Sequence, residues 1–430
     1  MKIKILVVSC TPWRNDNSVG NSYTNIFKGI DNIEIAHICC GGGVPETDFV
    51  KRHFHINEKR IIENIFNNNI KTGIEINDVN NVEVEEINNI KNDKSLFNFM
   101  RIHRFQIFFW IRDFIWSFKN WKSPELKAFV DSFQPNIIFA PFLDSKYLNE
   151  MIIFLHEYIK KPVVVYGWDD VYTLKQFSVS PFYWINKFYQ RSKLKKIADI
   201  SSIMYTISKI QQEEYSNIFS KNCNILYKGY EFIEYPKADR KLNSPIQLVF
   251  TGNITSGRWK SLSKIGNALH EINKEFIKAQ LIIYTHSPLS KKMKRALKIK
   301  DSVLIKPAIS NNKVARIQQE ADILVHAESF DLKEKLQVRM SFSTKLVDYF
   351  NNARCIFAVG SEDVASIDYL ISNDAAIVCK NEDEIIKKLT EVIEKPELIH
   401  DYSKKSWECG KKNHKIDEIQ EKLYNDLKSL

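Results

Sequence analysis

Short apolar runs recur along the chain, and a longer stretch with the apolar spacing of a helix follows each of them. Runs without polar alternation are typical of strands that are buried on both faces of a parallel sheet. Their alternation with helices predicts two doubly wound, Rossmann-like α/β domains. The runs are residues 3–8, 33–39, 137–140, 163–166, 203–207 and 225–227 in the first half, and residues 247–250, 281–284, 303–305, 323–325, 355–359 and 376–379 in the second.

The polar stretch at residues 235–245, YPKADRKLNSP, lies between the two halves and predicts a hinge. We therefore predict an N-terminal domain over residues 1–238 and a C-terminal domain over residues 239–400. Residues 401–430 have a helical pattern and are expected to pack back on the N-terminal domain. Ligands of open parallel sheets bind at the carboxyl ends of the strands, so two such domains predict a site in a cleft between them.

The composition is that of a globular chain, because 44% of the 430 residues are hydrophobic and 27% are charged. The net charge of +10 favours anionic partners, which include nucleotides, nucleic acids and acidic membrane surfaces. The basic residues are dispersed and form no recognised nucleic-acid-binding motif, so we expect no nucleic acid as a partner.

Seven cysteines without C-x-x-C spacing indicate free thiols in a reducing compartment, and argue against disulfide bonds and a structural zinc site. The N-terminal apolar run is too short for a signal peptide. No run approaches the roughly 20 apolar residues of a membrane-spanning helix. We therefore expect a cytoplasmic protein.

The loop after the first predicted strand is long and polar, and it contains Gly20 just before a helical pattern. A glycine there would let backbone N–H groups approach a phosphate, although a plain connecting loop would have the same sequence. After the strand at residues 163–166, Asp169 and Asp170 offer carboxylates for acid–base work. The alternative for this pair is a helix cap and a surface charge.

The loop that opens the second half, FTGNITSGRWKSL, joins a strand to a helix and contains Gly252, Asn253, Arg258 and Lys260. Cations next to a helix N-terminus form a site for a diphosphate, whereas the alternative is a basic surface loop. The sequence matches neither the G-x-G-x-x-G pattern nor the G-x-x-x-x-G-K-[ST] pattern, which excludes those two nucleotide-binding motifs.

The stretch MSFSTKLVDYF, residues 340–350, predicts a short helix that begins at Ser343, Thr344 and Lys345. The first N–H groups of a helix lack internal partners and favour an anion, and Lys345 adds a positive charge. Asp348 lies close to one turn further along, where its carboxylate is placed to accept hydrogen bonds from ribose hydroxyls. The alternative is a capped surface helix in which Asp348 pairs with Lys345.

Together these segments resemble the bacterial glycosyltransferases of the GT-B fold, in the retaining family 4-like group that builds surface polysaccharides. The resemblance spans most of the chain. FTGNITSGRWKSL resembles the donor-diphosphate loop, and VHAESF followed by SFSTKLVDYF resembles the nucleotide-sugar segment. YGWDDVY followed by SPFYWINKFYQRSKLKKIAD resembles the acceptor-side segment of the first domain, and CNILYKGYEF resembles the last strand before the hinge.

The chain departs from this family at several positions. Many members carry two glutamates eight residues apart, whereas here the second is Asp348 and the first position holds Met340. Glu328, which lies before an insertion, would then supply the first carboxylate. Asn253 stands where the family usually has an arginine, so the cation would come from later in the same loop.

The resemblance implies that the chain transfers a sugar from a nucleoside-diphosphate sugar to a glycan acceptor, expected to be lipid-linked, with retention and without a cofactor or metal. Arg258 or Lys260, together with Lys345, would stabilise the leaving diphosphate, and Asp169 would orient the acceptor hydroxyl. Two alternatives stay open: an inverting transferase that uses Asp169 or Asp170 as base, and a non-catalytic nucleotide-binding protein. The predicted binding residues are Gly20, Gly252, Asn253, Arg258, Lys260, Glu328, Ser343, Thr344, Lys345 and Asp348.

Residues 105–118, FQIFFWIRDFIWSF, are too apolar for an ordinary surface helix, and basic residues flank them. On a helical wheel, Gln106, Asp113 and Ser117 form a narrow polar stripe. An apolar face with basic flanks predicts peripheral binding to an anionic membrane at the inner face of the cell membrane. The alternative, which the sequence supports equally, is a core helix beneath the first sheet.

Overall fold

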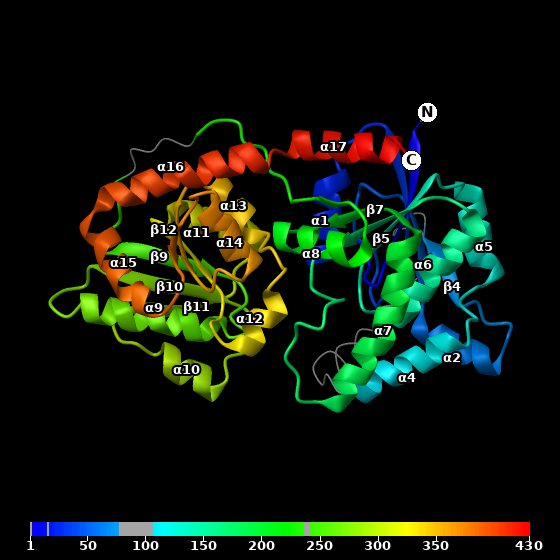
Figure 1. The fold of residues 1–430 in the computed structure, drawn as a ribbon, viewed down its shortest axis with the longest axis horizontal. Helices are drawn as coiled ribbons and strands as arrows, with labels where there is room; N and C mark the ends of the chain where they lie inside the picture. Colours follow the sequence, from blue (N-terminus) through cyan, green and yellow to red (C-terminus); the bar gives the residue numbers. More distant parts are fainter. Residues whose placement is uncertain (1, 15–16, 77–105, 236–240) are drawn as a thin grey trace. The chain divides into compact units, whose positions relative to one another are not determined.

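The computed structural model describes the chain except for residues 1, 15–16, 77–105 and 236–240. Its internal contacts form two compact units, shown in Figure 1. Unit 1 comprises Met1–Thr173, Ser178–Leu226 and Glu418–Leu430, and unit 2 comprises Leu174–Phe177 and Tyr227–Asp417. The predicted domain ranges and the cleft between the domains stay predictions, and residues 236–240 of the predicted hinge lie outside the described residues.

Unit 1 contains an eight-stranded sheet in the order β4-β3-β2-β1-β5-β6-β7-β8, which is parallel except for the antiparallel pairing of β4 with β3. The strand order reverses between β1 and β5. The strands are β1 (Ile3–Ser9), β2 (Ile33–Cys39), β3 (Arg52–Ile56), β4 (Gly73–Ile76), β5 (Ile137–Pro141), β6 (Val163–Gly167), β7 (Ser201–Thr206) and β8 (Cys223–Ile225). The helices are α1 (Ser18–Phe27), α2 (Glu58–Phe66), α4 (Gln106–Ser117), α5 (Pro124–Phe133), α6 (Lys146–Ile159), α7 (Pro181–Ile200), α8 (Lys209–Phe219) and α17 (Ile416–Lys428), the last from Glu418 onward.

Unit 2 contains a six-stranded parallel sheet in the order β11-β10-β9-β12-β13-β14, and its strand order reverses between β9 and β12. Helices cover both faces of this sheet, with α9 and α10 on one face and α11 and α13 on the other (Figure 1). The strands are β9 (Ile246–Thr251), β10 (Ala279–Thr285), β11 (Val303–Pro307), β12 (Ile323–Ala327), β13 (Cys355–Val359) and β14 (Ile377–Cys379). The helices are α9 (Arg258–Ile272), α10 (Lys291–Leu297), α11 (Asn311–Glu320), α12 (Leu332–Val338), α13 (Lys345–Asn351), α14 (Ala365–Ser372), α15 (Asp383–Glu394) and α16 (Pro396–Asn413).

The predicted α/β fold with two parallel-dominant sheets is confirmed, and each predicted apolar run overlaps a strand. The central strands are buried along their whole length, as β12 and β13 illustrate, because helices cover both faces of the sheet. β3 and β4 were not predicted. All seven cysteines are free thiols, as the cysteine spacing predicted.

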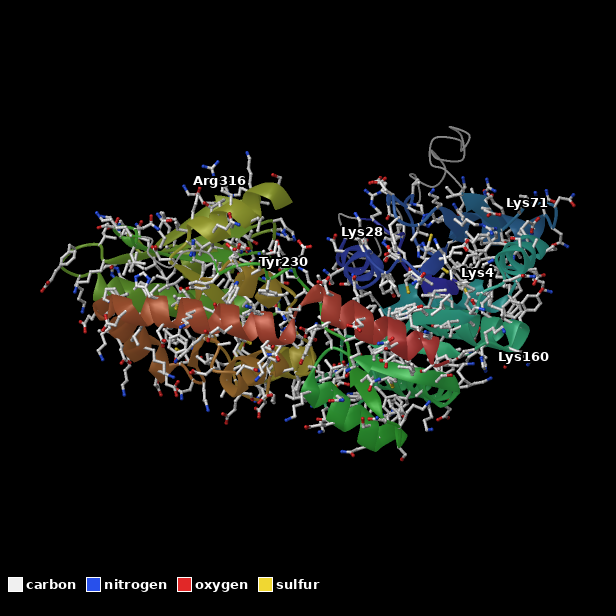
Figure 2. The ribbon with its side chains drawn as sticks, turned by 90° about the horizontal axis from the view of Figure 1, so that it is seen from above. Lys4, Lys28, Lys71, Lys160, Tyr230 and Arg316 are labelled. Atoms are coloured by element: carbon white, nitrogen blue, oxygen red, sulfur yellow. The ribbon has the colours of Figure 1, made fainter. Side chains whose placement is uncertain are left out.

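The basic surface residues are spread over the units. Figure 2 labels Lys28, Lys71 and Lys160 of unit 1, and these exposed side chains point outward from separate places at the end of α1, before β4 and after α6. Arg316 of unit 2 is also exposed and pairs with Glu320 one turn along α11.

Candidate active site

Two loops of unit 2 leave neighbouring strands at the point where the strand order reverses. The first follows β9 and contains Gly252, Asn253 and Arg258, and the second follows β12 and contains Glu328. In open parallel sheets a crevice forms at such a reversal, because the two loops diverge to opposite faces of the sheet. The topology therefore brings together the residues that the sequence had placed in two separate segments.

The loop after β9 is shaped by its own hydrogen bonds. Gly252 has a φ of 121°, a backbone conformation that favours glycine, and a Cβ there would lie 2.8 Å from Lys345 Nζ. Its N–H donates to the Tyr284 carbonyl at 2.9 Å. The Asn253 side chain accepts hydrogen bonds from Thr255 N and Ser287 Oγ, both at 2.8 Å. Asn253 therefore fixes the loop, which is the role of an Asx turn.

The first N–H groups of α9 are also engaged. Arg258 N donates to the Thr255 carbonyl at 3.3 Å, Trp259 N to the Ile254 carbonyl at 3.0 Å, and Lys260 N to the Gly257 carbonyl at 2.9 Å. Because these amides bond to their own loop, an anion at this position would be met chiefly by side-chain cations.

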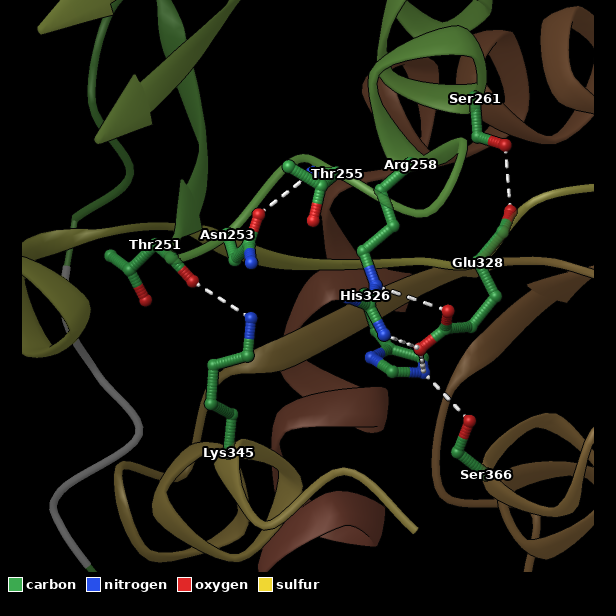
Figure 3. A network of polar contacts seen from close by, with 9 residues as sticks. All are labelled: Thr251, Asn253, Thr255, Arg258, Ser261, His326, Glu328, Lys345 and Ser366. Carbon is green, nitrogen blue, oxygen red and sulfur yellow. Dashed lines mark hydrogen bonds and ion pairs between the residues drawn. The ribbon is translucent and has the colours of Figure 1, made fainter. Parts of the chain in front are cut away.

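Arg258 and Glu328 form a bidentate ion pair in the centre of the site (Figure 3). Arg258 Nε donates to Glu328 Oε2 and Arg258 Nη2 to Glu328 Oε1, each at 3.0 Å. The Glu328 side chain is 4% exposed and the Arg258 side chain 22% exposed. Two further bonds fix the Glu328 backbone: its N–H donates to the Val359 carbonyl at 2.8 Å, and Ser261 Oγ donates to its carbonyl at 2.6 Å.

His326 lies beneath this pair and was not singled out from the sequence. Its Nε2 is 3.8 Å from Glu328 Oε1 and 3.0 Å from Ser366 Oγ (Figure 3). Burial, together with the positive charges of Lys345 and Arg258, lowers the pKa of His326 to about 3. The imidazole is therefore neutral at physiological pH and contributes hydrogen bonds, without adding a third cation.

Lys345, the first residue of α13, points toward the loop after β9 (Figure 3). Its Nζ donates to the Thr251 carbonyl at 3.0 Å and lies 4.7 Å from the centre of the Phe250 ring. Burial and the charge of Arg258 lower the pKa of Lys345 to about 8, while Glu328 and Asp348 act in the opposite direction. Because the buried positive charge of Lys345 is only partly balanced by nearby carboxylates, a bound anion would stabilise its charged form.

The remaining predicted residues of unit 2 lie around this centre. Lys260 pairs with Asp331, the N-cap residue of α12. The predicted helix start is confirmed, since α13 begins at Lys345 with Thr344 at the N-cap, and the Ser343 carbonyl accepts the Leu346 N–H at 3.0 Å.

Asp348 pairs with Lys228 rather than with Lys345. Asp348 Oδ1 and Lys228 Nζ are 2.6 Å apart, and the Asp348 side chain is 35% exposed. Neither of the two predictions for Asp348, a ribose contact or an ion pair with Lys345, included Lys228 as a partner. The two residues of this pair are 120 positions apart in the sequence, and no local pattern signals such a contact.

The predicted residues of unit 1 have structural contacts of their own. The Gly20 N–H donates to Asn17 Oδ1 at 2.7 Å, and a Cβ on Gly20 would come within 2.1 Å of the Arg14 carbonyl oxygen. Glycine is thus required there by the close approach of the chain, and its N–H is already bonded.

Asp169 and Asp170 differ in their surroundings. The buried Asp170 carboxylate accepts hydrogen bonds from the Thr173 N–H at 2.9 Å and from the Thr173 hydroxyl, so it fixes a turn after β6. Asp169 is exposed, and its carbonyl accepts a hydrogen bond from Gln211 Nε2 at 3.0 Å. Of these two residues, Asp169 is therefore the more exposed.

Within the residues that the structure describes, His, Cys, Asp and Glu side chains nowhere gather in a group of three or more that could hold a metal ion. The described helices also include none with both the length and the apolar character to cross a membrane.

Solved structures with this arrangement of strands and helices are glycosyltransferases of the GT-B fold. HepE from Anabaena, solved in complex with UDP, is 10% identical over 100% of both chains with a TM-score of 0.62. Sucrose-phosphate synthase from Thermosynechococcus elongatus is 11% identical over 100% of both chains with a TM-score of 0.64. The pneumococcal O-GlcNAc transferase GtfA, solved with UDP and GlcNAc, is 12% identical over 72% of this chain and 60% of its own, with a TM-score of 0.50.

The expected GT-B fold is therefore confirmed. At these identities the likeness establishes the fold alone. No protein-family model matches the sequence, and no curated protein sequence matches it either.

Proposed function

We propose that the protein is a glycosyltransferase that moves a sugar from a nucleoside-diphosphate sugar to a glycan acceptor. The observation that carries the proposal is the grouping of Arg258, Lys345 and Glu328 where the strand order of unit 2 reverses. The arrangement of two cations beside a buried carboxylate suits a substrate with an anionic diphosphate and a hydroxyl-rich sugar.

The proposed chemistry is loss of the diphosphate from the anomeric carbon. The barrier falls when preorganised positive groups meet the charge that develops on the leaving phosphate. Arg258 and Lys345 would serve this purpose, and Glu328 would accept hydrogen bonds from the sugar or keep Arg258 in place. We expect no requirement for a divalent metal, so chelation with EDTA should leave turnover unchanged.

UDP is the first nucleotide to test, because the HepE and GtfA structures contain it. We further propose retention of the anomeric configuration and a lipid-linked glycan acceptor in cell-surface polysaccharide synthesis. These proposals come from the sequence resemblance. The inverting alternative would use Asp169 or Asp170 as base, and Asp169 is the more exposed of the two.

The decisive experiment is calorimetric titration with UDP, GDP, dTDP and CMP, followed by turnover with the matching sugars. Lys345→Met should weaken binding of the nucleoside diphosphate by about 1.5–3 kcal/mol, which is roughly 10- to 150-fold in Kd. Lys264→Met is the matched control, because Lys264 is a lysine of α9 in the same unit but pairs with Glu382. Failure of all four nucleotides to bind would refute the proposal, and NMR of the product would separate retention from inversion.

A further inference from the structure

The described side chains of α4 include a largely buried arginine and several exposed large apolar residues. Arg112 points inward, where it pairs with Glu58 and lies 4.5 Å from the centre of the Tyr147 ring. Trp116 is also buried and donates from its indole nitrogen to Glu58 at 2.9 Å. On the outside, Trp110, Ile111 and Phe114 are 38%, 49% and 64% exposed. The core alternative for this helix therefore does not account for these side chains. Phe105, which the sequence analysis included in this helix, lies outside the described residues.

The helix α7 likewise combines a buried cation with exposed large apolar side chains. Lys187 is 4% exposed and donates to the Val171 carbonyl at 2.8 Å inside unit 1. Phe182, Ile185 and Phe188 are 55%, 60% and 58% exposed, and Tyr189 is 46% exposed. Their spacing of three or four residues places them along one side of the helix.

The exposed side chains of the two helices meet at one ring contact. α4 and α7 of unit 1 meet near the start of each helix (Figure 1), where the Trp110 and Phe182 rings lie edge to face with centres 5.8 Å apart. We call this the aromatic surface. Contiguous exposed apolar side chains of this kind mark an interaction site, because their hydration is costly in free energy. The aromatic surface consists of Trp110, Ile111, Phe114, Phe118, Phe182, Ile185, Phe188 and Tyr189.

The charge next to the aromatic surface indicates its partner. The same side of α7 continues into Lys195 and Lys196, which are 47% and 53% exposed. They pair with Asp199 and Glu157 in exposed ion pairs, which are weak and exchange readily for other anions. Aromatic side chains followed by lysines match the order of acyl chains, interface and phosphates in a bilayer. The basic residues of α7 are Lys187, Arg191, Lys193, Lys195 and Lys196, against the single acid Asp199.

We infer that the aromatic surface inserts into the interface of an anionic lipid bilayer, with Lys195 and Lys196 at the level of the phosphates. This inference rests on the proposed function and deepens it, because membrane binding would hold the chain beside a lipid-linked acceptor. It extends the sequence prediction from one helix to a two-helix surface. Insertion depends on apolar area and charge together, so both should be required.

The test is flotation of the full chain with phosphatidylcholine vesicles, with and without phosphatidylglycerol. The chain should float only with the anionic vesicles, and added salt should weaken this binding. Ile111→Ser/Phe114→Ser and Ile185→Ser/Phe188→Ser should each weaken it by roughly tenfold or more. The control Phe276→Ser/Ile277→Ser removes equally exposed side chains of unit 2, at 62% and 42%, and should have no effect.

The charge contribution is tested separately. Lys195→Ala/Lys196→Ala should weaken vesicle binding by roughly tenfold or more, since each lysine near an anionic surface contributes about a fivefold factor. Lys395→Ala/Lys404→Ala, which removes two exposed lysines of unit 2, should leave it unchanged. All variants should bind UDP like the unmodified chain.

Two results would overturn the inference. One is equal flotation of the aromatic-surface variants and the control. The other is concentration-dependent self-association that these variants abolish without any vesicle binding, which would show that a second copy covers the surface. Loss of UDP binding in the unmodified chain would instead count against the proposed function, so the two failures are distinguishable.

Discussion

At the scale of single residues, Lys345 is the group whose protonation reports on the site. Its pKa is lowered from the ordinary 10.5 to about 8, chiefly by burial and then by Arg258. Below pH 8, Lys345 is charged in both the folded and the unfolded chain, and burying this charge lowers the free energy of unfolding. The free energy of unfolding rises as the pH rises from about 8 to 10.5, because the folded chain then holds neutral Lys345 while the unfolded chain still binds the proton. A bound diphosphate would favour the charged form and restore the higher pKa.

We therefore predict that nucleoside-diphosphate binding takes up a proton above pH 8, because neutral Lys345 must become charged. Affinity should fall with rising pH by at most about tenfold per unit. Calorimetry at pH 9 in buffers of different ionisation enthalpy measures the uptake. Lys345→Met should abolish it, and uptake that persists in this variant would assign the proton to another group.

The adjacent acids Asp169 and Asp170 give a second prediction at this scale. Asp169→Asn should lower turnover strongly without changing UDP affinity, because Asp169 is exposed at the carboxyl end of β6, where ligands of parallel sheets bind. Asp170→Asn should instead lower the melting temperature, because the Asp170 carboxylate holds the Thr173 N–H and hydroxyl. Turnover and thermal unfolding of both variants distinguish the roles. Normal turnover in Asp169→Asn would show that Asp169 has no role in catalysis.

At the scale of elements, α13 carries Lys345 at its start and Asp348 one turn later. If Asp348 binds ribose, Asp348→Ala should weaken UDP and uridine alike by roughly 1.5–3 kcal/mol. Lys228→Ala breaks the same ion pair and frees the carboxylate, so it should preserve or improve binding. Titration of both variants with UDP and uridine measures this. Equal losses in the two variants would show that the pair itself, and not Asp348 alone, shapes the site.

The strands show how far the sequence determined the fold. The runs at residues 323–325 and 355–359 became β12 and β13 because a continuous apolar run has few alternatives to a doubly covered strand. β3 was not predicted because its sequence, RHFHI, contains an arginine and two histidines and therefore forms no continuous apolar run. Both histidines are buried, and their ring nitrogens bond to the Val50 and Gly41 carbonyls at 2.8 Å. Backbone partners of this kind are invisible in a hydropathy pattern.

The site was determined by the sequence only in part. Each loop was recognisable from its position after a strand, and the helix start at Lys345 followed from local preference. The pairings were not recognisable, because Arg258 and Glu328 are 70 positions apart and meet only through the strand order. His326 looked like an ordinary strand residue, and its contact with Ser366 spans 40 positions.

At the scale of the whole molecule, the end of the chain contributes to both units. α16 belongs to unit 2, where a Cβ on Gly410 would meet Phe232 and Phe350 at 2.6 Å. From Glu418 onward α17 belongs to unit 1, where Gln420 Nε2 donates to the Asn25 and Lys28 carbonyls at 2.9 and 2.7 Å. The packing of unit 1 is therefore complete only when α17, near the end of the chain, has docked onto it.

The dependence of unit 1 on the chain end gives the last prediction. Leu423 is fully buried on α17, so Leu423→Ala should cost about 2–5 kcal/mol and lower the melting temperature by roughly 5–15 °C. Leu430→Ala is the matched control, because Leu430 is 44% exposed and should contribute little. UDP affinity should survive Leu423→Ala below its melting temperature, since the donor residues lie in unit 2. Thermal unfolding with and without UDP tests both parts, and equal melting temperatures for the two variants would show that α17 contributes little to the stability of unit 1.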